Sequence, residues 1–253
     1  MSEKTIFWHL LFLCISVKGH SVIILDLGGV VFKEPEFFVY ENLPADIKNT
    51  IPESYKNRRT FLRAFDFANF IAQDDLKKKW LFGSVNGADV AQLISDNIDN
   101  PIIASFFEND YERLMIKHGA TMMLDPEKIA LWSKPNPAAV DFIQRCHTQG
   151  IRILVLSNWD PISFKSLVQT HHNIFGNIKP EDLFIPASIG YAKPEQEAYQ
   201  KVLNHTHIDP KNCIFIDDSK NNVIAAQKCG ITSILHVDWD QTIAQLPSET
   251  LTI

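Results

Sequence analysis

Three short runs of apolar, mostly β-branched residues constrain the fold of this chain more than any other feature. The runs read VIIL at 22–25, IRILVL at 151–156 and CIFI at 213–216. Largely unbroken apolar runs of this length are typical of strands that are buried on both faces of a parallel sheet. Two weaker runs, at 183–185 and 231–237, predict further strands of the same sheet.

Helical patterns lie between these runs. The clearest covers 136–149, where Asn136 is a favourable N-cap, Pro137 takes the first helical position and Gly150 follows the last turn. Two more helices are expected at 195–203 and 222–229. Strands that alternate with helices of this length predict an α/β fold with a doubly wound, Rossmann-like parallel sheet.

The segment from 34 to 130 has a different texture, with aromatic and charged residues and no comparable buried run. We interpret it as a helical insertion in the α/β core. The expected organisation is an N-terminal extension at 1–21, a core made of 22–33 and 131–253, and the insertion at 34–130. A chain of 253 residues with 45% hydrophobic content is long enough to bury such a core.

The N-terminus carries an apolar run at 6–17 (IFWHLLFLCISV) after Lys4. The run is shorter than the roughly 20 residues that cross a bilayer, so no stable membrane span is expected. It suits either the core of a signal peptide cleaved near residue 19 or an ordinary buried helix. A cytoplasmic location is favoured, and a secreted or periplasmic one follows if residues 1–19 are a cleaved signal.

Charge and cysteine content exclude some classes of function. The formal net charge of −6 and the absence of a long Lys/Arg block argue against binding to nucleic acid. The four cysteines form no CxxC pair, so neither a zinc site nor a redox dithiol is expected. Three of them lie in or beside apolar segments and are expected to be reduced core residues, namely Cys146, Cys213 and Cys229.

Polar side chains stand where the buried runs end. In chain order these residues are Asp26, Ser157, Asn158, Asp217 and Asp218, and Lys193 follows the weaker run at 183–185. Ligands of open α/β sheets bind beyond the carboxyl ends of the strands, so we expect these side chains to meet at one edge. Carboxylates gathered there repel one another unless a cation lies between them. Mg²⁺ takes oxygen ligands and is usually shared with substrate phosphate, so the pattern predicts a magnesium and phosphate site.

Each of these residues, taken alone, has a simpler interpretation. Asp26 is a common residue type at the start of a glycine turn, and Ser157 is a common helix cap. Lys193 before a proline is an ordinary loop residue. Their order along the chain and their shared position at strand ends favour the functional interpretation instead.

Four motifs resemble those of the haloacid dehalogenase superfamily, in the family's order and over essentially the whole chain from residue 22. They read DLGGV at 26–30, LSN at 156–158, KP at 193–194 and DDSKNN at 217–222. One such motif is weak evidence, but four in order are specific. The resemblance implies that the insertion is the family's helical cap, which excludes water and selects the leaving group.

The resemblance also implies a reaction. Asp26 would attack the phosphorus of a small phosphorylated metabolite to form an aspartyl-phosphate, which water then hydrolyses. Ser157, Asn158 and Lys193 would bind the phosphate group during its transfer. The chain is therefore expected to be a hydrolase of the phosphatase type.

A magnesium site follows from the same resemblance. Mg²⁺ would be bound by Asp26, the backbone carbonyl of Gly28 and Asp218. Asp217 would act through a water molecule or as a partner of the direct ligands. Most phosphatases of the family carry a second aspartate two residues after the nucleophile, where this chain has Gly28, so the usual general acid is missing.

The missing acid leads to a hypothesis about substrates. General acid catalysis typically contributes about 100-fold to 10,000-fold to the rate. We therefore expect good substrates to have leaving groups that need little protonation, such as anomeric sugar phosphates, acyl phosphates or aryl phosphates.

Two other functions remain open at this point. One is cleavage of a carbon–halogen bond, as in the dehalogenase branch of the superfamily. That chemistry needs no magnesium, so the pair Asp217 and Asp218 argues against it. The other is a catalytically weak protein that keeps the fold and binds a partner, which the glycine at position 28 favours and the retained Asp26, Lys193 and Asp218 disfavour.

Overall fold

The computed structural model of the protein describes residues 22–33, 43–52, 60–247 and 250. The apolar run at 6–17 and the signal peptide considered for it lie outside the described residues. No helix in the described part of the chain is long and apolar enough to cross a membrane.

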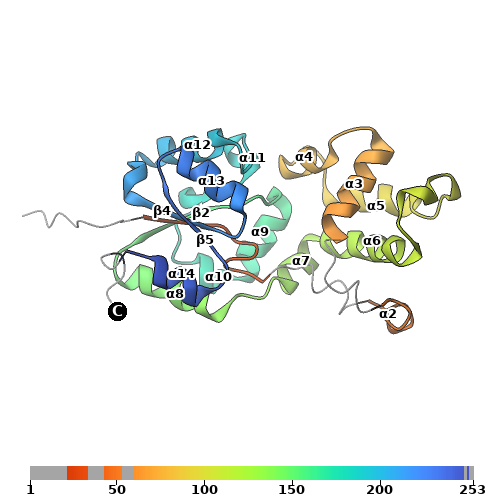
Figure 1. The fold of residues 1–253 in the computed structure, drawn as a ribbon, viewed down its shortest axis with the longest axis horizontal. Helices are drawn as coiled ribbons and strands as arrows, with labels where there is room; N and C mark the ends of the chain where they lie inside the picture. Colours follow the sequence, from red (N-terminus) through yellow and green to blue (C-terminus); the bar gives the residue numbers. More distant parts are fainter. Residues whose placement is uncertain (1–21, 34–42, 53–59, 248–249, 251–253) are drawn as a thin grey trace, which may run out of the picture.

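A five-stranded parallel sheet forms the centre of the core (Figure 1). Its strands are β1 (Val22–Leu25), β2 (Arg152–Leu156), β3 (Leu183–Phe184), β4 (Cys213–Asp217) and β5 (Thr232–Leu235). Their order is β3-β2-β1-β4-β5, with Leu25 paired to Val155 on one side and to Ile216 on the other. The chain thus builds the sheet outward from β1 in one direction and then in the other, and the direction changes between β1 and β4, where open α/β sheets bind their ligands.

Helices cover both faces of this sheet and bury its apolar side chains in two clusters. On one face, Ile23 and Leu25 of β1 pack with α8 (Pro137–Thr148), α9 (Pro161–Thr170), α10 (His172–Phe175) and α14 (Trp239–Gln245). On the other face, Ile24 packs with α12 (Gln196–Thr206) and α13 (Lys220–Lys228). The remaining elements of the core are short: η3 (Pro180–Asp182), α11 (Pro186–Ile189) and η4 (Pro210–Asn212). The predicted doubly wound α/β fold is confirmed.

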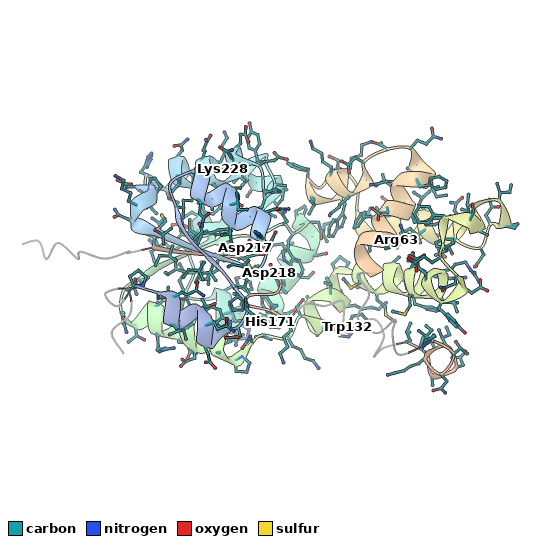
Figure 2. All side chains as sticks on the ribbon, viewed as in Figure 1. Arg63, Trp132, His171, Asp217, Asp218 and Lys228 are labelled. Atoms are coloured by element: carbon teal, nitrogen blue, oxygen red, sulfur yellow. The ribbon has the colours of Figure 1, made fainter. Side chains whose placement is uncertain are left out.

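Between β1 and α8 the described residues form helices joined by turns and loops, and they contain no strand. The elements are α2 (Ala45–Lys48), α3 (Thr60–Ala72), α4 (Leu76–Leu81), α5 (Gly87–Asn97), η2 (Pro101–Phe106), α6 (Asp110–Met123) and α7 (Pro126–Trp132). Helices α3 to α6 share an apolar cluster of their own, which includes Phe65, Phe67 and Ile94. Figure 2 labels Arg63 in this lobe, where its guanidinium bonds the buried Glu112 at 2.8 Å.

Sequence patterns predicted the strong elements better than the weak ones. Helix α8 starts at Pro137, the side chain of Asn136 caps it, and Gly150 follows with a φ of 71°. The two weaker strands are shorter than their apolar runs. Cys146 and Cys213 are buried free thiols, as predicted. Cys229, the C-cap of α13, is also a free thiol and packs against the core cluster that includes Ile24, but it is only partly buried.

Candidate active site

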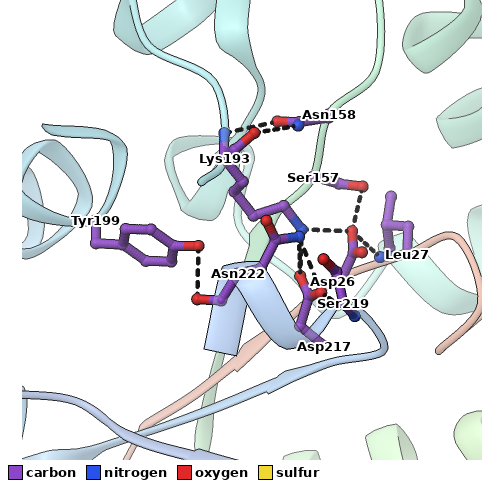
Figure 3. Close-up of polar contacts among 9 residues, drawn as sticks. All are labelled: Asp26, Leu27, Ser157, Asn158, Lys193, Tyr199, Asp217, Ser219 and Asn222. Carbon is purple, nitrogen blue, oxygen red and sulfur yellow. Dashed lines mark hydrogen bonds and ion pairs between the residues drawn. The ribbon is translucent and has the colours of Figure 1, made fainter. Parts of the chain in front are cut away.

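Asp26 directly follows β1 and is held by its neighbours on both sides (Figure 3). Its N–H donates to the carbonyl of Ile216 in β4 at 3.0 Å. Its Oδ1 accepts three hydrogen bonds, from the N–H of Leu27 at 2.7 Å, the hydroxyl of Ser157 at 2.6 Å and the ammonium of Lys193 at 2.8 Å. Three donors on one oxygen fix the orientation of this buried carboxylate.

Lys193 lies between two carboxylates and is almost completely buried. Its Nζ is 2.8 Å from Oδ1 of Asp26 and 2.6 Å from Oδ2 of Asp217. Burial alone would lower the pKa of this ammonium, but the charges of Asp26 and Asp217 outweigh burial and raise the pKa above its ordinary value. The lysine therefore stays charged, and it links the ends of β1 and β4.

Asp217 is the last residue of β4 and has no exposed surface. Its Oδ1 accepts from the N–H of Ser219 at 2.8 Å, and the Asn222 amide donates to both of its oxygens at 2.9 and 3.1 Å. Burial and the nearby charge of Asp26 raise the pKa of Asp217, while Lys193 opposes that rise. Asn222 belongs to the fourth motif, but the sequence did not indicate that its side chain binds Asp217.

Asn158 uses its side chain on the backbone of Lys193. Its Nδ2 donates to the Lys193 carbonyl at 2.8 Å, and its Oδ1 accepts from the Lys193 N–H at 3.0 Å (Figure 3). Both polar ends of the Asn158 amide are thus engaged within the protein. The phosphate contact predicted for Asn158 stays a prediction, and the observed contacts give this side chain a role in placing Lys193.

Three carboxylates can share one metal ion at this edge. Asp26, Asp217 and Asp218 each offer an oxygen, and these oxygens lie within 4.8 Å of one another. Asp218 is exposed, whereas the other two are buried, so the cluster opens toward solvent on one side. Gly28 lies two residues after Asp26, and a Cβ added there would meet no heavy atom within 4 Å. The metal contact predicted for its carbonyl stays a prediction.

The structure therefore brings the predicted residues together at the carboxyl ends of β1, β2 and β4. A buried carboxylate, an ammonium group, a hydroxyl and further carboxylates at one edge can together hold a divalent cation and an anionic group. Among the described residues, Trp239 is a further contact at this edge that the sequence motifs did not indicate. Its indole, at the start of α14, contacts the turn after Asp26.

Comparisons with known proteins agree with this geometry. A family model described as haloacid dehalogenase-like hydrolase matches residues 20–230. The chain is 26% identical over 233 residues to enolase-phosphatase E1 of Naegleria gruberi, which covers 88% of each chain. It is 28% identical over 115 residues to a sesquiterpene phosphatase of Aspergillus oryzae, covering 45% of this chain and 56% of that protein.

A solved structure shares the fold at lower identity. It is a HAD family enzyme of Bacteroides thetaiotaomicron, with a TM-score of 0.53 and 19% identity over 89% of this chain and 99% of that one. The same enzyme in complex with magnesium and inorganic phosphate gives a TM-score of 0.50 and 20% identity over 88% of this chain and 99% of that one.

Proposed function

The chain belongs to the haloacid dehalogenase-like hydrolases, and from that we propose that it is a magnesium-dependent phosphatase that acts through an aspartyl-phosphate on Asp26. The observation that carries the proposal is the cluster at the sheet edge. Asp26, Asp217 and Asp218 lie within metal-binding reach of one another, and the ammonium of Lys193 bonds two of them. The phosphatase names of the two relatives and the magnesium–phosphate complex of the Bacteroides enzyme support it.

The charges at the site fit a divalent cation. Three carboxylates and one ammonium leave two negative charges at the sheet edge, which one Mg²⁺ ion would balance. Mg²⁺ prefers carboxylate and carbonyl oxygens and keeps several waters. In this proposal Asp26, Asp218 and the Gly28 carbonyl bind the ion directly. Asp217 acts through a water molecule or as a partner of these direct ligands. When bound, the ion supplies positive charge to the phosphate oxygens.

The remaining residues hold and move groups during the reaction. Asp26 forms a bond to phosphorus while the bond from phosphorus to the leaving oxygen breaks, and that oxygen keeps the electron pair. Ser157 and Lys193 donate to the phosphate oxygens as charge builds on them. Water then attacks the same phosphorus, the bond to Asp26 breaks, and inorganic phosphate leaves the restored carboxylate.

The finer part of the proposal concerns substrate. We place the cap at 34–130, where its helices would shield the site from water and select the leaving group. Because Gly28 offers no acid, the preferred substrates are small phosphorylated metabolites whose leaving group departs with little protonation. Anomeric sugar phosphates, acyl phosphates and aryl phosphates meet that condition.

The test is phosphate release from a panel of phosphorylated metabolites and aryl phosphates, with and without Mg²⁺. The wild type is compared with Asp26→Asn, which keeps the shape of the side chain but removes its nucleophilic charge. We expect Mg²⁺-dependent release by the wild type and a loss of at least about 1,000-fold in the variant. Release that does not need Mg²⁺ would contradict the metal assignment.

A matched control separates the loss of the nucleophile from the loss of any buried acid. Asp182 is as buried as Ser157 and lies at the opposite end of the sheet, where it pairs with Arg152. Asp182→Asn should therefore lower stability and leave the turnover per folded molecule near that of the wild type. If Asp26→Asn retains activity, or if no substrate releases phosphate, the proposal is wrong, and a binding role becomes the better explanation.

A further inference from the structure

A tight turn follows the nucleophile and is closed on a single carbonyl. The Leu27 carbonyl accepts the N–H groups of Val30, Val31 and Phe32 at 3.3, 2.9 and 2.8 Å. Gly29 adds a bond from its N–H to the Phe32 carbonyl at 2.8 Å. We call residues 27–32 the nucleophile turn. Its conformation decides where the backbone next to Asp26 lies, including the peptide of Gly28.

The outer side of this turn is held by the other end of the chain. Trp239 is the first residue of α14, and its indole N–H donates to the Val30 carbonyl at 3.1 Å. Both residues are buried, with exposed fractions of 3% and 1%. Among the residues that the structure describes, Trp239 is the donor found on this carbonyl. A buried carbonyl that loses its partner is strongly disfavoured, so the bond constrains the turn.

Trp239 is itself fixed from several directions. Its ring lies 4.8 Å from that of Phe142 in α8 and 5.2 Å from that of His236. The Nδ1 of His236 pairs with the hydroxyl of Thr242, which has no exposed surface, at 2.8 Å. The N–H of His236 donates to the Asp217 carbonyl at 2.9 Å.

These contacts tie both acid-bearing strand ends to one segment. The segment 236–242 bonds the turn after β1 through Trp239 and the end of β4 through the backbone of His236. Asp26 precedes the first contact, and Asp217 makes the second. The segment 236–242 thus adds a third link between the two strand ends, beside the pairing of β1 with β4 and the Lys193 ammonium.

We propose that Trp239 is a positioning residue for the reaction at Asp26. Its indole N–H holds the Val30 carbonyl, and thereby keeps the nucleophile turn in the conformation that sets the position of the Gly28 carbonyl, which the proposed function assigns to the metal. This inference rests on the proposed function for its effect on turnover, but its effect on the turn is independent of any activity. Partners of this kind, which orient the groups that bind a metal, typically change metal affinity or activity by about 10-fold to 100-fold when they are lost.

The test removes the N–H donor and keeps the ring. 3-Benzothienylalanine, in which sulfur replaces the indole N–H, is placed at position 239 alone. Trp239→Phe is the genetically simpler companion. Phe142→Leu is the matched control, because it disturbs the same ring packing and leaves the indole N–H in place. Each protein is compared per folded molecule, by Mg²⁺ titration calorimetry, by kcat and KM, and by amide hydrogen exchange.

We expect the benzothienyl protein to bind Mg²⁺ at least about 10-fold more weakly and to lose a similar factor in kcat, with a smaller change in KM. The amides of Val31 and Phe32 should exchange faster, while those of Ile23 and Ile24 in β1 stay as in the wild type. Phe142→Leu should lower stability without these changes. Wild-type values for Mg²⁺ affinity, kcat and turn exchange in the benzothienyl protein would overturn the proposal.

Failure of the proposed function would look different. A wild type that releases no phosphate from any substrate would refute the phosphatase assignment. Calorimetry and amide exchange would still decide whether Trp239 holds the turn.

Discussion

Lys193 shows how single residues set the charge of this site. Its ammonium bonds Asp26 and Asp217, and its own backbone is held from both sides by the amide of Asn158. The ring of Phe215 lies 5.6 Å below the ammonium, so the lysine rests on an aromatic face as well. A buried lysine needs such support, because removing its charge from water is unfavourable. That cost is offset only if the ammonium stays within reach of both carboxylates.

Asn158→Ala tests this support. We expect the variant to lose about 10-fold or more in kcat, because Lys193 would no longer be held at its place near the phosphate. The melting temperature should change little, because Asn158 is exposed. Asn204→Ala is the control. It removes an exposed asparagine of α12, away from Lys193, and should keep wild-type turnover. Equal turnover in the two variants would contradict the assignment.

Gly28 offers a second test at the residue scale. Because no heavy atom lies within 4 Å of an added Cβ, the site has room for Gly28→Asp. A proton donor there should raise the turnover of alkyl phosphates, whose leaving groups need protonation, by up to about 100-fold, and that of aryl phosphates much less.

Gly28→Asn is the matched control, since it has the same shape and no acidic proton. The comparison is made across leaving groups of different pKa. A wild type whose turnover does not depend on leaving-group pKa would show that another residue already supplies the proton, and the substrate hypothesis would then be wrong.

The aspartates that cap α9 and α7 have pKa values shifted in opposite directions. Asp160 caps α9, which follows Ser157 and Asn158, with bonds to the N–H groups of Ile162 and Ser163. Burial dominates there and raises the pKa of Asp160. Asp125 caps α7, and backbone and Lys128 contacts outweigh its burial and lower its pKa.

As the pH changes, the contributions of the two caps to the free energy of unfolding should therefore change in opposite directions. A raised pKa means that Asp160 contributes stability below its ordinary pKa and loses it as pH rises through the folded-state value. Asp160→Asn, which keeps a good cap, should gain unfolding free energy relative to the wild type between about pH 4 and pH 7.

Asp125→Asn should do the reverse. The lowered pKa of Asp125 contributes stability above its ordinary value, and that stability is lost as pH falls. The variant should therefore lose unfolding free energy relative to the wild type at pH 7 and approach it in acid. Urea unfolding of each variant and of the wild type at about pH 4 and pH 7 measures how the difference in unfolding free energy changes with pH. Changes of the same sign for the two variants would refute the argument.

At the scale of the whole molecule, the helices between β1 and α8 meet the elements around the sheet mainly through α7 and α9. Helix α7 leads from the insertion back to the core and packs on α9, and the ring of His171 bonds the Ala130 carbonyl of α7 at 2.9 Å. Figure 2 labels His171 and Trp132 in this region. Trp159, next to Asn158, packs against the core cluster and against the cluster around Met115 and Ile129. The position of α7 is thus coupled to the residues that follow β2.

Gly83→Ala tests that coupling. Gly83 has a φ of 74°, and a Cβ there would lie 2.9 Å from Cγ of Pro161 at the start of α9. Gly150→Ala is the matched control, because Gly150 has a φ of 71° and open space around it. Both variants should lose about 1 kcal/mol of stability from the left-handed backbone. Only Gly83→Ala should also change kcat/KM, and equal effects on kcat/KM would show that the contact does not matter for catalysis.

The strands, the sheet edge and the candidate site residues could be read from the sequence, for a local reason. A strand buried on both faces is a short apolar run, and the residue after such a run must lie at the carboxyl edge of the sheet. Asp26, Ser157 and Asp217 follow that rule, so their meeting was predictable without coordinates. The weaker runs at 183–185 and 231–237 predicted the bounds of β3 and β5 less accurately, because the apolar pattern of these outer strands is weaker.

The partners of these residues were decided only by the tertiary structure. Asn158 and Lys193 are 35 positions apart, and Trp239 and Val30 are 209 apart. No periodicity links such positions, because their contacts form only when the sheet has brought distant segments together. Sequence alone predicted that the side chains of Asp26, Ser157 and Asp217 meet at this edge of the sheet. The fold decided which of them hold the others in place, because hydrogen bonds act over about 3 Å and the spacing of residues along the chain does not fix that distance.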